Sequence, residues 1–134
     1  MGAKTLTFSS VYEIPREDVK AAQTVVSSSV PDALDLWIDK LADKESSGRE
    51  DVVIVDVNGY RSYGCLQFQL RTFQGFYPLL KASTTPQNYE SWRKAIMDCP
   101  TQKRLTKAML GANPGAWSHW YTSVKKRNLG LPPK

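Results

Sequence analysis

The spacing of apolar residues along the chain predicts a mostly helical protein with one small β element. Helices are expected at about residues 15–26, 32–45, 62–77, 86–97, 100–110 and 114–127. Between the second and third of these, a β-branched run at 52–57 leads into Asn58-Gly59, a strong signal for a two-residue hairpin turn. The predicted fold class is therefore α+β, mostly α, with the hairpin placed between two helices.

One position conflicts with the apolar pattern of the helix predicted at 32–45. The apolar stripe has i, i+3, i+4, i+7 spacing and consists of Leu34, Trp37, Ile38 and Leu41. Glu45 falls on the same stripe at i+11. An apolar surrounding raises the pKa of a carboxyl, which is what a general acid working near neutral pH needs. The alternative is that Glu45 lies at a frayed helix end and points to water.

Composition sets limits without choosing a function. A chain of 134 residues suits one domain with one core, and we expect that domain at 30–134, after an N-terminal segment at 1–29. The net charge of +5 favours polyanionic surroundings such as nucleic acid, anionic lipid or an acidic cell-wall polymer. No apolar run approaches the roughly 18 residues of a membrane span, and the N-terminus lacks the apolar core of a signal peptide.

The cysteines and the histidine do not form a metal-binding pattern. Cys65 and Cys99 are far apart in sequence and His119 is solitary, so neither a metal site nor a cofactor is expected. The cysteines could form a disulfide or remain as two buried thiols, and the sequence leaves both open. His119 is expected to pack at or near the surface of the last predicted helix.

The order of chemical groups after Glu45 is typical of sites that cleave glycosides. The hairpin at 52–61 comes next and is followed by SYGCLQ at 62–67. Gly64 would permit close approach of a ligand or of backbone, and Gln67 carries a donor and an acceptor suited to an N-acetyl group or a hydroxyl. Tyr60 and Tyr63 flank the hairpin exit and are candidate sugar contacts.

The blocks ESSG at 45–48 and SYGCLQF at 62–68 resemble the lytic transglycosylase domain of the lysozyme-like superfamily, and the resemblance covers about residues 30–127. It implies a lysozyme-like fold in which Glu45 is the catalytic acid and base. Such an enzyme cuts the bond between N-acetylmuramic acid and N-acetylglucosamine of peptidoglycan and leaves 1,6-anhydro ends. The substrate-binding residues that we infer are Ser46, Tyr60, Ser62, Tyr63, Gly64, Gln67 and Tyr121. The family's late motif is incomplete in GANPGAW at 111–117, which leaves Trp117, Trp120 and Tyr121 as alternatives for the late sugar contact.

Two further functions remain open at this point. Asp56 interrupts an apolar strand and is a candidate second carboxylate, which would make the protein an inverting lysozyme, unless its side chain only bonds to turn amides. A basic nucleic-acid-binding module is the other alternative, although the basic residues are spread along the chain and no signature of such a module is present. We expect a monomer that acts on peptidoglycan strands in the cell wall, the periplasm or outside the cell, with no nucleic-acid partner. The missing signal would suit a phage-delivered protein, a secretion-associated protein or a trimmed chain.

Overall fold

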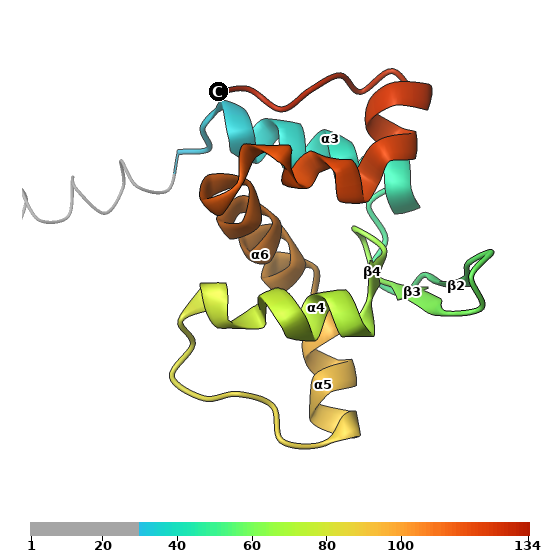
Figure 1. Ribbon diagram of the computed structural model, residues 1–134, viewed down its shortest axis with the longest axis vertical. Coiled ribbons are helices and arrows are strands. Elements are labelled where there is room, and N and C mark those ends of the chain that lie inside the picture. The colour runs from blue at the N-terminus through green and yellow to red at the C-terminus, as the bar shows by residue number, and fades with distance from the viewer. Residues whose placement is uncertain (1–29) are drawn as a thin grey trace, which may run out of the picture. The chain divides into compact units, whose positions relative to one another are not determined.

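The computed structural model describes residues 30–134. Along this part of the chain, one helix is followed by a small sheet and then by several helices (Figure 1). The first elements are α3 (Ala33–Ser46), β2 (Val53–Val55), β3 (Arg61–Tyr63), β4 (Phe68–Gln69), α4 (Leu70–Phe76) and the 3₁₀ turn η1 (Tyr77–Leu80). They are followed by α5 (Tyr89–Ile96), α6 (Cys99–Ala112), η2 (Pro114–Trp120) and η3 (Thr122–Lys126). The predicted class, α+β and mostly α, is confirmed. The helix predicted at 15–26 lies outside the described residues.

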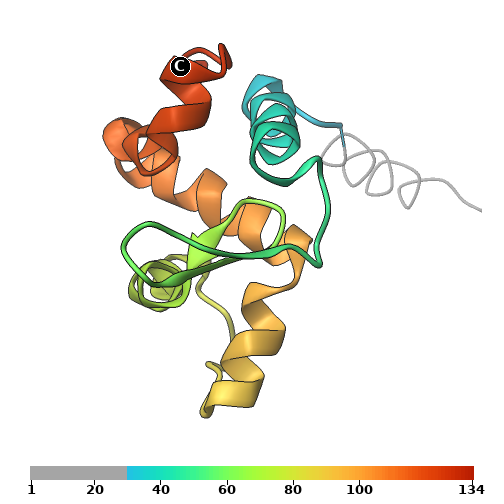
Figure 2. The ribbon, with the colours of Figure 1, turned by 90° about the vertical axis from the view of Figure 1, so that its right-hand side faces the viewer.

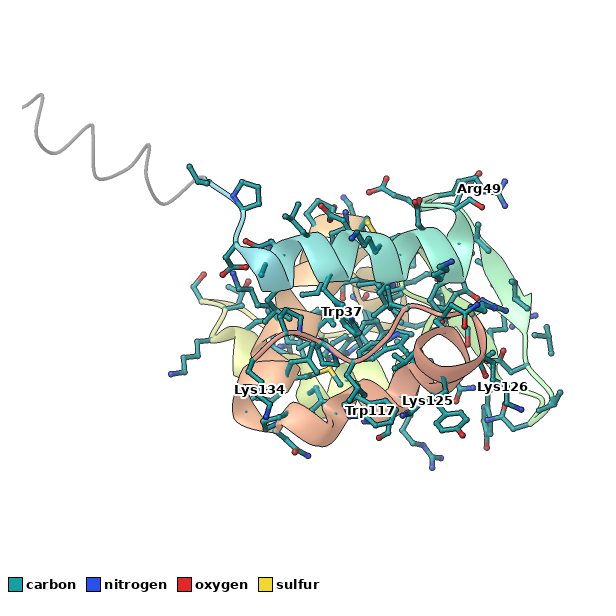
Figure 3. All side chains as sticks on the ribbon, turned by 90° about the horizontal axis from the view of Figure 1, so that it is seen from above. Trp37, Arg49, Trp117, Lys125, Lys126 and Lys134 are labelled. Atoms are coloured by element: carbon teal, nitrogen blue, oxygen red, sulfur yellow. A yellow bond between two sulfur atoms is a disulfide. The ribbon has the colours of Figure 1, made fainter. Side chains whose placement is uncertain are left out.

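Helix α3 packs on α6, and the apolar stripe predicted for α3 faces the core. The most deeply buried apolar side chains of the core are Ile38, Leu41, Leu66, Phe73, Ile96, Leu105 and Met109. Trp37 is also buried, and its indole Nε1 donates a hydrogen bond to the backbone oxygen of Gly130 at 3.1 Å. Figure 3 shows Trp37 between α3 and the C-terminal segment that this bond ties down.

The sheet has the antiparallel order β2-β3-β4, so the predicted hairpin is present and a third short strand extends it. Its turn differs from the predicted two-residue form. Asp56 N–H donates to the Tyr60 oxygen at 2.8 Å, and Gly59 N–H donates to the Asp56 oxygen at 2.9 Å. Only Gly59 of the three loop residues has a positive φ, 85°, which is typical of a three-residue hairpin loop.

The segment that follows the hairpin is where the predicted helix at 62–77 is wrong. Residues 62–69 form β3, a turn and β4, and α4 begins only at Leu70. Gly64 and Gln67 have φ values of 78° and 54°, which a right-handed helix does not accommodate. The turn is held by the fully buried side chain of Gln102. Its Oε1 accepts from Leu66 N–H at 2.8 Å, and its Nε2 donates to the Tyr63 oxygen at 2.7 Å.

Helix α6 joins this turn covalently to the rest of the core. Cys65 and Cys99 form a disulfide, which decides between the two alternatives that the sequence left open. Asp98 caps the start of α6 by accepting a hydrogen bond from Thr101 N–H. The helix runs from Cys99 to Ala112, so it ends two residues beyond the limit of the range predicted at 100–110.

The last predicted helix, 114–127, has the expected extent but a different type of winding. The chain forms the 3₁₀ helix η2 and then the π-helix η3. Trp120 and Val124 are buried in the core. Trp117 stacks on Tyr121 with ring centroids 6.4 Å apart, and Lys125 Nζ lies 5.4 Å from the Trp117 ring centre (Figure 3).

Candidate active site

Glu45 lies in the last turn of α3, where that helix packs against η3. Its carboxylate accepts a hydrogen bond from Ser123, whose Oγ is 2.5 Å from Glu45 Oε2 and whose side chain is fully buried. Burial raises the pKa of Glu45 above its usual value, since a desolvated carboxylate is costly to ionise. The Ser123 hydrogen bond and the Arg127 charge oppose this rise in pKa, and the negative charge of Asp56 adds to it.

Glu45 opens onto a cavity of about 510 Å³, which we call the Glu45 cavity. The residues that line it come from three parts of the fold: the end of α3, the sheet with the start of α4, and the segment 118–127. Figure 2 shows the course of the backbone through these three parts. The polar lining residues that bear on the chemistry are Asp56, Ser62, Gln67, Gln69, His119 and Arg127. The arrangement places one partly desolvated acid opposite a polar wall, which suits recognition of a polyhydroxylated ligand.

Asp56 faces this cavity rather than the hairpin turn. Its Oδ2 accepts hydrogen bonds from the Ser62 hydroxyl and from Gln69 Nε2, the latter at 2.9 Å. The turn amide of Gly59 bonds to the backbone oxygen of Asp56 and not to its side chain. The interpretation of Asp56 as a turn-capping side chain is therefore wrong, and two carboxylates share one cavity wall.

Gln67 reaches the cavity from the left-handed turn between β3 and β4. Its Nε2 donates to the backbone oxygens of Gly64 at 2.8 Å and Val52 at 3.3 Å, which fixes the amide group. In the part of the chain that the structure describes, no donor reaches Gln67 Oε1. The fixed amide therefore offers an acceptor to a ligand.

Six of the sequence-predicted residues line the Glu45 cavity, namely Glu45, Asp56, Ser62, Gln67, Trp120 and Tyr121, whereas Trp117 does not. Ser46, Tyr63 and Gly64 are buried behind its wall. The buried Ser46 hydroxyl donates to the Cys65 oxygen at 2.8 Å and so ties α3 to the turn, rather than facing a ligand in the cavity. A Cβ at Gly64 would lie 2.6 Å from Gln102 Nε2, so this glycine makes room for a core amide and not for a ligand.

The sequence did not single out Ser123, Gln69 or Gln102, and it indicated Arg127 only as a cation at a helix end. Gln102 carried a readable signal, because it precedes Leu105 and Met109 by three and seven residues and so is a polar residue on an apolar stripe. Ser123 carried none, since its partner Glu45 is 78 residues away. Tyr60 lines a different cavity, which is described below.

Within residues 30–134, no three histidine, cysteine, aspartate or glutamate side chains are grouped so that they could hold a metal ion. The helices of that same region are too short or too polar to cross a membrane. Comparison of the chain with family models, with curated proteins and with solved structures finds no match.

Proposed function

We propose that this protein is a lytic transglycosylase with a lysozyme-like fold, which cleaves the glycan strands of peptidoglycan. The observation that carries the proposal is the position of Glu45, a partly buried carboxyl with a raised pKa on the wall of a polar cavity. A carboxyl with a raised pKa retains its proton closer to neutral pH and can donate it to a leaving group. The resemblance of ESSG and SYGCLQF to the family's motifs supports the same assignment.

The reaction needs two proton transfers, and Glu45 serves both. Glu45 first gives its proton to the glycosidic oxygen as the bond from that oxygen to C1 of the muramyl residue breaks. The resulting carboxylate then takes the proton from the 6-hydroxyl of the same residue as that oxygen bonds to C1. The products are a free 4-hydroxyl and a 1,6-anhydro ring, so no water is consumed. The demands on the protein are positioning of the sugar and control of one pKa.

The hydrogen bond from Ser123 makes the two carboxylate oxygens of Glu45 chemically different. The Ser123 hydroxyl occupies Oε2, which leaves Oε1 as the atom that exchanges protons with the substrate. The hydrogen bond also stabilises the carboxylate during the interval in which Glu45 acts as a base, and the nearby positive charge of Arg127 acts in the same direction. Ser123 is accordingly a positioning residue.

The substrate contacts that we assign come from both sides of the cavity. Gln67 Oε1 would accept a hydrogen bond from a sugar hydroxyl or from the N–H of an N-acetyl group. Tyr121 is about half exposed and offers a ring face to a sugar, held in place by its stacking on Trp117. The positively charged chain would also be drawn to an acidic wall polymer.

A second candidate is an inverting lysozyme in which Asp56 activates water. The observation that favours it is that Asp56 lines the cavity of Glu45 and acts on it electrostatically. Against it, Ser62 and Gln69 both bond to Oδ2 of Asp56 and hold it toward the sheet. This geometry favours an electrostatic role for Asp56.

Mass spectrometry of the muropeptides released from purified sacculi in water enriched in ¹⁸O tests the proposal. A lytic transglycosylase gives anhydro ends without label, which are lighter than reducing ends by one water molecule. A lysozyme gives reducing ends that carry ¹⁸O. Release of neither product from sacculi of several chemotypes would refute both assignments.

A further inference from the structure

A second cavity lies on the other face of the sheet. It measures about 830 Å³ and is lined by residues that include Val55, Arg61 and Tyr63, whereas the Glu45 cavity is lined by Ile54 and Ser62. Neighbouring residues of a strand point to opposite faces, and the register pairs Val55 with Arg61 and Ile54 with Ser62. We call it the tyrosine cavity, after Tyr60, Tyr63 and Tyr89 in its wall.

The tyrosine cavity has a different chemical character from the Glu45 cavity. Its charged lining residues are Arg61 and Arg71, and no aspartate or glutamate contributes to its wall. Neither arginine forms an ion pair within residues 30–134. Tyr63 is buried, and Tyr89 and Arg61, which also line the cavity, are close enough to influence its hydroxyl electrostatically. Two arginines in a wall that also contains aromatic rings and no acidic residue are typical of a site for a carboxylate-bearing ligand.

The two cavities adjoin each other at the junction of β4 and α4. Gln69 and Thr72 line both of them. The cavities occupy opposite faces of a sheet, so a straight polymer held in the first would not continue into the second. A side branch of that polymer could pass over the junction at Gln69 and Thr72 and enter the second.

We infer that the tyrosine cavity binds the carboxylate-bearing peptide stem of a peptidoglycan strand whose sugar lies in the Glu45 cavity. This inference rests on the proposed function, and it names the form of the substrate: strands that still carry their stems. Arg71 supplies the carboxylate contact and Tyr60, which is 59% exposed, packs on the peptide backbone. The site selects for stems by binding them and takes no part in the proton transfers.

Cleavage rates on two matched substrates test the inference. The substrates are glycan strands with intact, uncrosslinked stems and the same strands after an amidase has removed the stems. We compare the cleavage rate of stem-bearing strands with that of stem-free strands. For the parent protein, one charge-assisted contact corresponds to a ratio of about ten between these two rates. In Arg71→Gln this ratio falls to about one. In the matched control Arg104→Gln it stays at the parent's value, since Arg104 lines neither cavity. A parent ratio of one, or an unchanged ratio in Arg71→Gln, would overturn the inference.

A binding measurement separates this inference from the proposed function. A synthetic stem tetrapeptide with free carboxylates is titrated into the parent and followed by NMR, with the same peptide in carboxamide form as the control. We expect the acidic peptide alone to shift the resonances of Arg71 and Tyr89. If no strand is cleaved but these shifts occur, the proposed activity fails and the stem site stands. If strands are cleaved and the acidic peptide causes no shifts, the stem site fails.

Discussion

Replacing Glu45 by glutamine removes the transferable proton and changes little else. The side chain keeps its size, and its amide oxygen can still accept the hydrogen bond from Ser123. General acid–base catalysis contributes about 10²- to 10⁴-fold to a rate. Glu45 carries out both proton transfers, and Asp56 is held by Ser62 and Gln69 and so does not substitute for it. We therefore expect a loss near the upper limit, about 10⁴-fold or about 5.4 kcal/mol in activation free energy.

The assay is the initial rate of muropeptide release from purified sacculi, quantified by mass spectrometry. The matched control is Glu90→Gln on α5, which lines neither cavity and should keep the parent's rate. If Glu45→Gln retained more than about one-tenth of the parent's rate, the loss would be only about 1.4 kcal/mol and the carboxyl would not be the acid.

The same variant tests the burial of Glu45 through the pH dependence of stability. Because its pKa is raised in the folded state, the folded chain binds this proton more tightly than the unfolded chain does. The protonated carboxyl therefore favours folding at acid pH, and this contribution is lost as pH rises through the folded-state pKa. Glu45→Gln should be more stable than the parent at neutral pH, with a difference that shrinks toward acid pH. Urea unfolding at several pH values measures this difference, and a difference independent of pH would contradict the burial argument.

Three other substitutions probe the parts around Glu45. Ser123→Ala removes a hydrogen bond that lowers the pKa of Glu45, so the alkaline limb of the pH–rate profile should move to higher pH. Asp56→Asn should slow release of anhydro products by less than about tenfold, or about 1.4 kcal/mol. A loss as deep as that of Glu45→Gln would instead support the inverting lysozyme. Gly64→Ala should lower the free energy of unfolding in urea by at least about 1–3 kcal/mol, because φ is 78° there and the new Cβ meets Gln102.

Two matched controls separate these effects from general damage. Ser83→Ala alters an exposed loop serine outside both cavities and should leave the pH–rate profile in place. An equal displacement of the limb in Ser83→Ala would show that Ser123 has no special link to Glu45. Gly75 lies within α4, and a Cβ added there would meet no atom from outside its own stretch of helix within 4 Å, so Gly75→Ala should raise stability by about 0.5–1 kcal/mol. Equal loss of stability in both glycine variants would refute the close approach at Gly64.

The candidate acid was predictable because periodicity is a local property. The i+11 position of Glu45 follows from counting along one helix, and the structure places that side chain on the helix face that packs toward the core. The hairpin was predictable for the same reason, from β-branched residues followed by Asn58-Gly59. In both cases the residues that determine the structure are within a few positions of one another.

The sequence-based predictions that were wrong concern segments whose structure depends on residues far away in the sequence. The apolar residues Leu66, Leu70 and Phe73 have helical spacing, which predicted a helix already at residue 62. The positive φ values of Gly64 and Gln67 form a turn instead, so the helix begins only at Leu70. That turn is stabilised by Gln102, which is 36 residues from Leu66, and no local preference encodes such a contact. Nothing in residues 114–127 indicated 3₁₀ and π winding, because the apolar spacing there matches an α-helix equally well.

The disulfide between Cys65 and Cys99 also couples the assembly of the cleft to its chemical surroundings. It spans 34 residues, and closing a loop of that length removes about 4 kcal/mol of chain entropy from the unfolded state. In a reducing cytoplasm this bond does not persist, and the segment that presents Gln67 loses its covalent anchor. A cell that synthesises the protein would then hold it in a weakened form until it reaches oxidising conditions, and the cleft would be fully braced only there. Dithiothreitol should reproduce that weakened form in vitro, and reoxidation should reverse it.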